Sequence, residues 1–332
     1  MKADQNNLLK WYKKNYREFP WRETEDPYKI WISEIMLQQT RATAVVPIYN
    51  RFLKKFPSVS SLANSPTELV MEYWAGLGYY SRARNIHKSA KIIKKNGFPN
   101  NHLELLELPG LGPYTARAIA SFAFGEKVGV LDGNVIRFLS RFHSLPLEWW
   151  KTPQRNQLQV LADEFANHSE SQLMNQALIE IGASICLPKN PACNICPLSL
   201  NCNGRKDKTI DSLPLKKAKR KEELWQCDLK LYINSKQQIA LVKNPNLPFL
   251  KSHWVFPGKA KKLEKKPVRK SFSEHSITHH KIYASIETKP KSSWTKKDQA
   301  NYGEITWVSI KDVKKKSPTS LTQKLLKQAD FI

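Results

Sequence analysis

Four of the five cysteines lie in one short segment, "CLPKNPACNICPLSLNC", with the spacing C-x6-C-x2-C-x5-C. They are Cys186, Cys193, Cys196 and Cys202. Four soft thiolates in one loop suit either tetrahedral zinc or an iron–sulfur cluster. The segment "MKADQNNLLKWYKKNY" has no apolar signal core, so we expect a cytoplasmic protein, in which clustered cysteines bind metal more often than they form disulfides. The spacing predicts a metal site and leaves the choice of metal open.

Two carboxylates are candidates for acid–base chemistry. Glu34 lies four residues after Ile30 and three before Leu37, so its helix face is partly apolar. Apolar surroundings raise a carboxyl pKa and keep the group protonated, as a general acid requires. Asp132, in "VLDGNVIRFLSR", stands where a helix N-cap is expected and could be both cap and catalyst. The alternatives are a solvated surface glutamate and a purely structural cap.

A glycine pair and the net charge both point to nucleic acid. Gly110 and Gly112, in "LPGLGPYTARAIASFAFG", precede a helical run, where backbone amides at a helix N-terminus can bind phosphate. Taken alone, the pair also fits an ordinary turn. The chain has 54 Lys and Arg against 29 acidic residues, a formal charge of +25, which favours a polyanionic partner. A lysine-rich composition without a specific partner is the alternative.

The first part of the chain, residues 1–204, reads as helical. Asp26 and Pro27 fit an N-cap and a first helical position, and Ser65 with Glu68 fits a capping box. Further helices are expected around residues 82–95, 114–124, 134–143, 154–167 and 171–184.

The composition changes after this helical part. Residues 205–223 are basic and contain proline, which predicts a linker. In residues 224–332, alternating apolar positions predict strands, with Cys227 most simply a strand residue, and "LTQKLLKQA" predicts a closing helix. A hydrophobic fraction of 41% allows two cores, so we expect a helical domain followed by a smaller α+β domain. No window approaches the length of a membrane span.

Four motifs carry a resemblance to a known family. "SEIMLQQTR" (33–41), "GLGYYSRARN" (76–85), "VLDGN" (130–134) and "NQALIEIGA" (175–183), together with the cysteine spacing, resemble the MutY-type adenine DNA glycosylases of the endonuclease III-like helix-hairpin-helix superfamily. The match covers nearly all of residues 8–204.

The resemblance implies an architecture and its cofactors. It implies an all-α helix-hairpin-helix glycosylase domain (1–204), with the hairpin at about 105–125 and an iron–sulfur loop at 186–202 that holds a [4Fe–4S] cluster. Gly110 and Gly112 would grip the DNA backbone, assisted by a monovalent cation at the hairpin. Residues 224–332 would form a Nudix-like recognition domain.

The same resemblance implies roles for individual residues. Glu34 would protonate adenine N7, Asp132 would stabilise or capture the oxocarbenium sugar, and Asn134 would support Asp132. Tyr114 stands where relatives with lyase activity have a Schiff-base lysine, so a monofunctional glycosylase is expected. The remaining substrate-binding positions are Arg17, Trp21, Arg22, Gln38, Gln39, Thr40, Tyr79 and Gln176, with Ile277, Thr278 and His279 in place of the family's lesion-reading Phe-Ser-His triplet.

We therefore expect a monomeric base excision repair enzyme, associated with the nucleoid and not with a membrane. It would flip adenine out of double-stranded DNA where adenine is mispaired with 8-oxoguanine or guanine, and hydrolyse its N-glycosidic bond. One alternative is a glycosylase with lyase activity on oxidised pyrimidines, which Tyr114 opposes. The other is a non-catalytic DNA-binding iron–sulfur protein, which the joint presence of Glu34, Asp132 and Gln176 opposes.

Overall fold

The chain forms two compact units. The computed structural model describes residues 2–218, 220–250, 253–267, 272–317 and 319–331, and it divides into unit 1, Met1–Lys217, and unit 2, Ala218–Ile332. The basic segment 205–223 straddles this division. Its first part contacts unit 1, because Arg141 Nε donates to the Leu213 carbonyl at 2.8 Å and Trp149 Nε1 donates to the Leu215 carbonyl at 3.0 Å.

Unit 1 is helical throughout its described residues. Its α-helices are α1 (Lys2–Asn15), α2 (Pro27–Leu37), α3 (Ala42–Lys55), α4 (Val59–Asn64), α5 (Thr67–Tyr73), α6 (Ser81–Asn96), α7 (His102–Leu106), α8 (Pro113–Phe124), α9 (Gly133–Phe142), α10 (Thr152–Ala166), α11 (Ser171–Ser184) and α12 (Asn203–Lys206). Short 3-10 helices η1 (Pro20–Arg22) and η2 (Ser199–Asn201) complete it. The five helices predicted between residues 82 and 184 are confirmed as α6 and α8 to α11.

Helix starts follow local chemistry in some places and not in others. Asp26 caps α2, as predicted, by accepting from the backbone amide of Tyr28 at 2.9 Å. The capping box predicted at Ser65 is wrong, because α5 begins at Thr67 with Pro66 as its N-cap. The Ser65 hydroxyl instead donates to the Ser61 carbonyl at 2.8 Å and so belongs to the end of α4.

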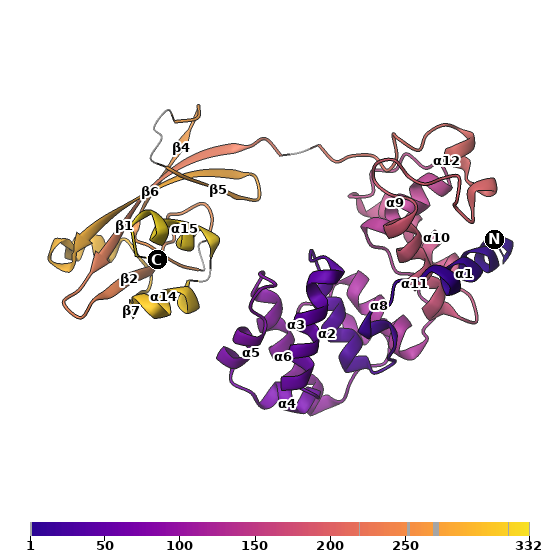
Figure 1. The fold of residues 1–332 in the computed structure, drawn as a ribbon, viewed down its shortest axis with the longest axis horizontal. Coiled ribbons are helices and arrows are strands. Elements are labelled where there is room, and N and C mark those ends of the chain that lie inside the picture. The colour runs from indigo at the N-terminus through magenta and orange to yellow at the C-terminus, as the bar shows by residue number, and fades with distance from the viewer. Residues whose placement is uncertain (1, 219, 251–252, 268–271, 318, 332) are drawn as a thin grey trace. The chain divides into compact units, whose positions relative to one another are not determined.

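Two hydrophobic cores lie side by side in unit 1. One contains Trp31, Phe52 and Trp74 and is built by α2 to α8. The other contains Leu139 and Phe165 and is built by α1 and α9 to α11. Helices α8 and α11 contact each other and join the two halves (Figure 1). A site whose walls come from α2 and α9 therefore lies where the two cores meet.

Unit 2 is a mixed α+β unit built on one sheet, shown in Figure 1. Its strands are β1 (Glu223–Ile233), β2 (Gln238–Lys243), β3 (Trp254–Val255), β4 (Gly258–Leu263), β5 (Ser273–Ile277), β6 (His280–Pro290) and β7 (Ile305–Ser309). The order is β3-β2-β1-β6-β5, with β4 paired to β1 and β7 paired to β2. Strand β1 runs parallel to β6, whereas β5 and β6 form an antiparallel hairpin.

Helices accompany the sheet of unit 2, and the last two of them contribute to its core. They are η3 (Lys291–Ser293), α13 (Lys296–Ala300), α14 (Ile310–Lys316) and α15 (Ser320–Gln328). Helix α15 contacts β5 and β6. Cys227 is buried on β1, which confirms it as a strand residue, and α15 confirms the predicted closing helix. Among the described residues, no helix combines the length and the apolar character that crossing a membrane would require.

Candidate active site

A cleft of about 990 Å³ opens in unit 1 between α2, α8, α9 and α11. Ten of the residues predicted as functional line it: Arg17, Trp21, Arg22, Glu34, Gln38, Gln39, Thr40, Tyr114, Asp132 and Asn134. These positions are spread over more than 110 residues of sequence, and the fold brings them together. A concave site with convergent polar groups is the usual form of a ligand-binding pocket.

Glu34 is buried in α2 with its carboxyl group on the cleft. Burial is the main cause that raises its pKa from 4.5 to about 7, and the nearby Asp132 charge raises it further, while the Tyr114 hydroxyl and Arg22 lower it. Its Oε2 atom has no hydrogen-bond partner among the described residues. A carboxyl group near half-protonation at neutral pH, with one oxygen that has no hydrogen-bond partner among the described residues, suits a general acid.

Asp132 is the N-cap of α9, as predicted, and its side chain is held on both oxygens. Oδ1 accepts from the Val135 amide at 2.7 Å, and Oδ2 accepts from Asn134 Nδ2 at 2.8 Å. Burial raises the pKa of Asp132, while these hydrogen bonds and Arg137 lower it. Since hydrogen bonds to a carboxylate favour its charged form, Asp132 is the better anion of the pair and Glu34 the better acid.

An ion-pair network that sequence reasoning missed forms one wall of the cleft. Glu180 of α11 is almost fully buried and accepts from Arg17 Nε at 2.6 Å and from an Arg22 guanidinium nitrogen at 2.6 Å. Arg22 also donates to the Arg17 carbonyl at 2.7 Å. Glu180 lies inside the quoted "NQALIEIGA" motif and is the only acidic residue of α11, which was the available signal.

The "QQT" segment between α2 and α3 is fixed by a buried arginine. Arg82 of α6 donates from its guanidinium group to the backbone carbonyls of Gln38 at 2.5 Å and Ile35 at 2.8 Å. Gln38 in turn donates to the Thr115 hydroxyl at 3.2 Å, and Gln39 adopts a positive φ of 57°. The hydrogen bonds from Arg82 hold this segment at the cleft. Arg82 was not among the predicted site residues.

Two of the substrate-binding residues predicted in unit 1 lie away from the cleft lining. Gln176 is buried in α11, where its Oε1 accepts from the Tyr12 hydroxyl at 2.5 Å. Tyr79 is 60% exposed, with a positive φ of 45° and with the Arg82 guanidinium 5.4 Å from its ring centroid. Trp21 does line the cleft, and it also stacks on Phe19, with the ring centroids 5.0 Å apart.

The predicted hairpin glycines have distinct structural roles. Gly110 adopts a φ of +86°, and a Cβ there would lie 2.7 Å from the Cβ of Asn85. Gly112 is the N-cap of α8. The α8 N-terminus therefore has its backbone amides next to a turn that contains two glycines, a geometry that can accept a phosphate.

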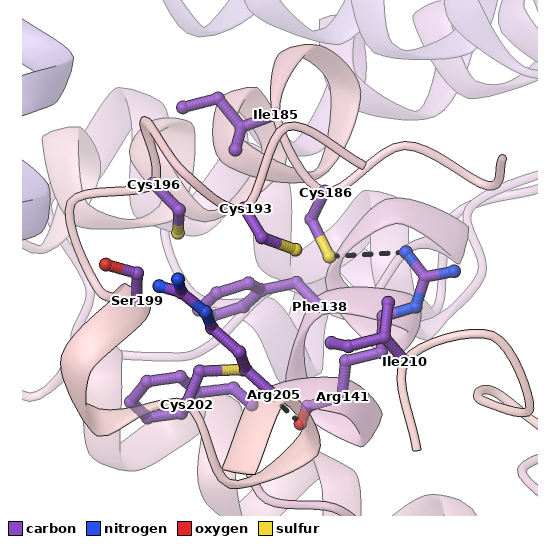
Figure 2. Close-up of a pocket in the computed structure, with 11 residues that line it drawn as sticks. Phe138, Arg141, Ile185, Cys186, Cys193, Cys196, Ser199, Cys202, Arg205 and Ile210 are labelled. Atoms are coloured by element: carbon purple, nitrogen blue, oxygen red, sulfur yellow. Dashed lines mark hydrogen bonds between the residues drawn. The ribbon is translucent and has the colours of Figure 1, made fainter. Parts of the chain in front are cut away.

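The four clustered cysteines surround one cavity, whose lining also includes Phe138, Arg141 and Arg205. Figure 2 shows the sulfur atoms of Cys186, Cys193, Cys196 and Cys202 facing the same space. These four cysteines form no disulfide among the described residues, and Arg141 donates to the Cys186 sulfur at 3.5 Å. Four convergent thiols with cationic neighbours fit a thiolate-bound metal centre.

One arginine connects this cavity to the cleft. Arg137 of α9 donates to the Cys186 carbonyl at 2.7 Å and to Asn134 Oδ1 at 2.9 Å. Because Asn134 also donates to Asp132, the cysteine loop is connected to Asp132 through Arg137 and Asn134. Sequence reasoning did not single out Arg137.

Thr278 and His279, the predicted lesion-reading residues, belong to unit 2. They form the turn between β5 and β6, where Thr278 adopts a positive φ of 54°. The Thr278 hydroxyl lies 3.3 Å from His279 Nδ1.

Comparisons with known proteins agree with this geometry. Residues 32–161 match the model of the HhH-GPD superfamily of base excision DNA repair proteins. The structure titled "Structure of a thermostable thymine-DNA glycosylase" aligns with a TM-score of 0.57 at 29% identity, over 62% of this chain and 98% of that one. An endonuclease III–DNA complex aligns at 23% identity with a TM-score of 0.51, over 62% of this chain and 94% of that one, and supports the fold alone. The fold is that of the helix-hairpin-helix DNA glycosylases.

Relatives of known function identify the family within this class of glycosylases. The adenine DNA glycosylase of Buchnera aphidicola subsp. Baizongia pistaciae is 41% identical over 265 residues, which cover 75% of this chain and 72% of that protein. The human adenine DNA glycosylase is 40% identical over 61% of this chain and 39% of its own length. The chain belongs to the adenine DNA glycosylase family, and it is a base excision repair enzyme that hydrolyses N-glycosyl bonds.

Proposed function

We propose that this enzyme excises adenine mispaired with 8-oxoguanine or guanine in double-stranded DNA, as a monofunctional glycosylase. The observation that carries the proposal is the pairing, in one cleft, of buried Glu34, whose pKa is about 7, with Asp132, whose two oxygens both accept hydrogen bonds. Such a division of roles between two carboxyl groups is the one that glycoside hydrolysis uses.

In the proposed reaction, Glu34 donates a proton to N7 of the flipped adenine. The bond between the base and C1′ of the sugar then breaks, and its electron pair leaves with the base. The carboxylate of Asp132 stabilises or captures the cationic sugar. Water then adds its hydroxyl group to C1′ and gives its other proton to the Glu34 carboxylate, which restores the acid. Asn134 orients Asp132, while Arg17, Trp21 and Arg22 form the pocket wall around the base, with Arg22 near the leaving group.

Tyr114 supports a monofunctional reaction. A lyase needs an amine at this position to form a Schiff base with the sugar, and a phenol cannot do so. The described residues that line the cleft include no lysine. The lyase alternative therefore has no nucleophile among these cleft residues.

We propose that the thiols of Cys186, Cys193, Cys196 and Cys202 hold a [4Fe–4S] cluster, which would organise the loop from 186 to 202. The basic residues Arg205, Lys206 and Lys208 directly follow this loop and would contact the DNA backbone. The amides at the start of α8, after Gly110 and Gly112, would bind a second phosphate. Tyr79, exposed on its loop, would stack beside the lesion. A monovalent cation at the hairpin stays a prediction.

For unit 2 we propose a Nudix-like fold and a role in recognising 8-oxoguanine. The mixed sheet with flanking helices and the turn that carries Thr278 and His279 support this role. Ile277 replaces the aromatic residue of the family's triplet, so the ring stacking that such a residue could supply is lost.

A single-turnover assay tests the proposal with duplexes that carry adenine opposite 8-oxoguanine, guanine or thymine, each with and without alkali. Adenine release from the first two duplexes, with strand breaks only after alkali, is the expected result. Strand breaks without alkali would indicate the lyase instead. Release of no base from any duplex would contradict excision of mispaired adenine.

A further inference from the structure

We infer that unit 2 contains a second metal site, made by Glu223, His279 and His280 and suited to a divalent transition metal such as Zn²⁺. One ligand atom from each of these residues lies within 4.8 Å of the other two. This set shares no residue with the four-cysteine cavity. Two imidazoles and one carboxylate form a common protein donor set for zinc.

Backbone pairing brings the three side chains together. The β5–β6 register pairs Ile277 with His280, so Thr278 and His279 form a two-residue turn. The parallel register of β1 with β6 places Glu223 next to His280, and the Glu223 amide donates to the His279 carbonyl at 2.8 Å. The ladder therefore fixes the backbone of all three residues before any ligand binds.

The turn also allows the side chains of His279 and His280 to lie on the same side of the hairpin. Consecutive strand residues point to opposite faces, so neighbouring histidines in a strand would normally diverge. Here His279 lies in the turn, after Thr278 with its positive φ, and its ring lies 4.0 Å from the His280 ring, measured between centroids. Both imidazoles therefore lie close to Glu223.

The donor atoms are already close to the spacing that a metal needs. His280 Nδ1 lies 3.2 Å from Glu223 Oε2 and has no hydrogen-bond partner among the described residues. Ligands at about 2.0–2.1 Å from a tetrahedral zinc ion are separated by about 3.3 Å. The His280–Glu223 distance already has about this length, and the His279 ligand atom lies within 4.8 Å of the other two. Trp225 and Phe249 pack against the His280 ring, and Trp225 Nε1 also donates to Glu223 Oε2 at 3.2 Å.

The local charge allows a cation to bind. Glu223 supplies a carboxylate, an acidic ligand beside the two imidazoles. Lys262 Nζ lies 2.6 Å from Glu223 Oε1, the oxygen that does not face His280. An exposed ion pair of this kind contributes little to stability, so Lys262 can swing into solvent at little cost. Imidazole donors favour zinc, nickel or copper over magnesium or calcium.

The site has a functional consequence, which depends on the proposed function of His279 in lesion recognition. A metal bound through this imidazole would remove it from the recognition surface. Excision opposite 8-oxoguanine would then slow towards the rate opposite guanine, while excision opposite guanine would stay unchanged.

Metal binding is tested without DNA, so this test can fail independently of the proposed glycosylase reaction. The full chain, with its cysteine loop loaded, is titrated with Co²⁺, followed by visible spectroscopy, and then with Zn²⁺ in competition. We expect one equivalent of Co²⁺ to bind and to give ligand-field bands. Thiolate charge-transfer bands, which would show that Co²⁺ binds at cysteine, should be absent.

Single substitutions assign the ligands. His279→Gln, His280→Gln and Glu223→Gln should each weaken Co²⁺ binding by more than about tenfold. His275→Gln is the matched control, because His275 lies on β5 of the same hairpin outside the proposed ligand set. His279 is in the turn, so His279→Gln decides the question if His280→Gln does not fold. The inference would be overturned if no Co²⁺ bound without thiolate bands, or if His279→Gln bound Co²⁺ as tightly as the parent does.

Discussion

The side-chain amide of Asn134 donates a hydrogen bond to Asp132 Oδ2 at 2.8 Å. The backbone amide of Val135 holds the other oxygen, so Asp132 has one orientation at the N-terminus of α9. A cap alone needs only the Val135 contact. The second contact fixes the oxygen that remains for the sugar cation, which makes Asn134 a positioning residue.

Replacing Asn134 by alanine tests this relationship. We expect Asn134→Ala to slow adenine release in single turnover by about 100-fold, because loss of orientation costs rates of this order. Binding to an abasic-site duplex should remain near that of the parent. Asn64→Ala, on the exposed end of α4, is the control and should behave as the parent does. Equal rates for Asn134→Ala and the parent would show that Asn134 does not position Asp132 for the reaction.

Glu34→Gln should slow base release by about 10²- to 10⁴-fold, the usual contribution of a general acid. The protonated form is the active one, so the rate of the parent should fall as pH rises through about 7, the pKa of Glu34. Single-turnover rates across a pH series provide the measurement. Glu72→Gln, at an exposed position of α5, is the matched control. A flat pH profile above 7 would argue against Glu34 as the acid.

The same carboxyl group makes a prediction about stability. Folding raises the pKa of Glu34 from 4.5 to about 7, so between these values the folded state binds more protons than the unfolded state, and stability falls as pH rises. From about pH 5 to about pH 8, the free energy of unfolding of the parent should fall by about 3 kcal/mol relative to Glu34→Gln. Urea unfolding of both proteins at each pH measures the difference. An unchanged difference would mean that Glu34 has an ordinary pKa in the folded state.

Local signals in the sequence predicted some features well and others poorly. Asp26 and Asp132 were predicted as N-caps and are N-caps, because a cap depends on residues within one turn. The capping box at Ser65 failed because the end of α4 uses that hydroxyl. The caps that were predicted correctly therefore depend only on residues next to them in the sequence.

Contacts between distant segments could not be read from such signals. Glu180 is defined by Arg17 and Arg22, about 160 positions away, and Arg137 by the Cys186 carbonyl, 49 positions away. Gln176 is a further case: its role at the base stays a prediction, while its hydrogen bond from the Tyr12 hydroxyl, 164 positions away, could not be read from its motif. The motifs identified the class of site, whereas its supporting shell required the packed structure.

Tyr114→Lys should introduce lyase activity into the cleft. An amine beside Asp132 can attack C1′ and form a Schiff base, which leads to strand cleavage without alkali. The measurement is strand breakage without alkali, together with trapping of the protein–DNA adduct by borohydride. Tyr114→Phe is the control and should give neither product. If Tyr114→Lys excises adenine without any trapped adduct, position 114 does not face the sugar.

The cysteine loop can be tested against the fifth cysteine, Cys227, which lies outside the loop. Cys196→Ser removes one of the four thiols that line the cavity, whereas Cys227→Ser removes a buried thiol from β1 in unit 2. Cys196→Ser should lose iron and sulfide and bind DNA more weakly, because a loop of four ligands cannot hold the cluster tightly with three. Cys227→Ser should keep its iron and differ from the parent only in the stability of unit 2. Iron and sulfide analysis beside DNA affinity measures both variants. A parent protein with stoichiometric zinc and no sulfide would assign the four thiolates to zinc instead.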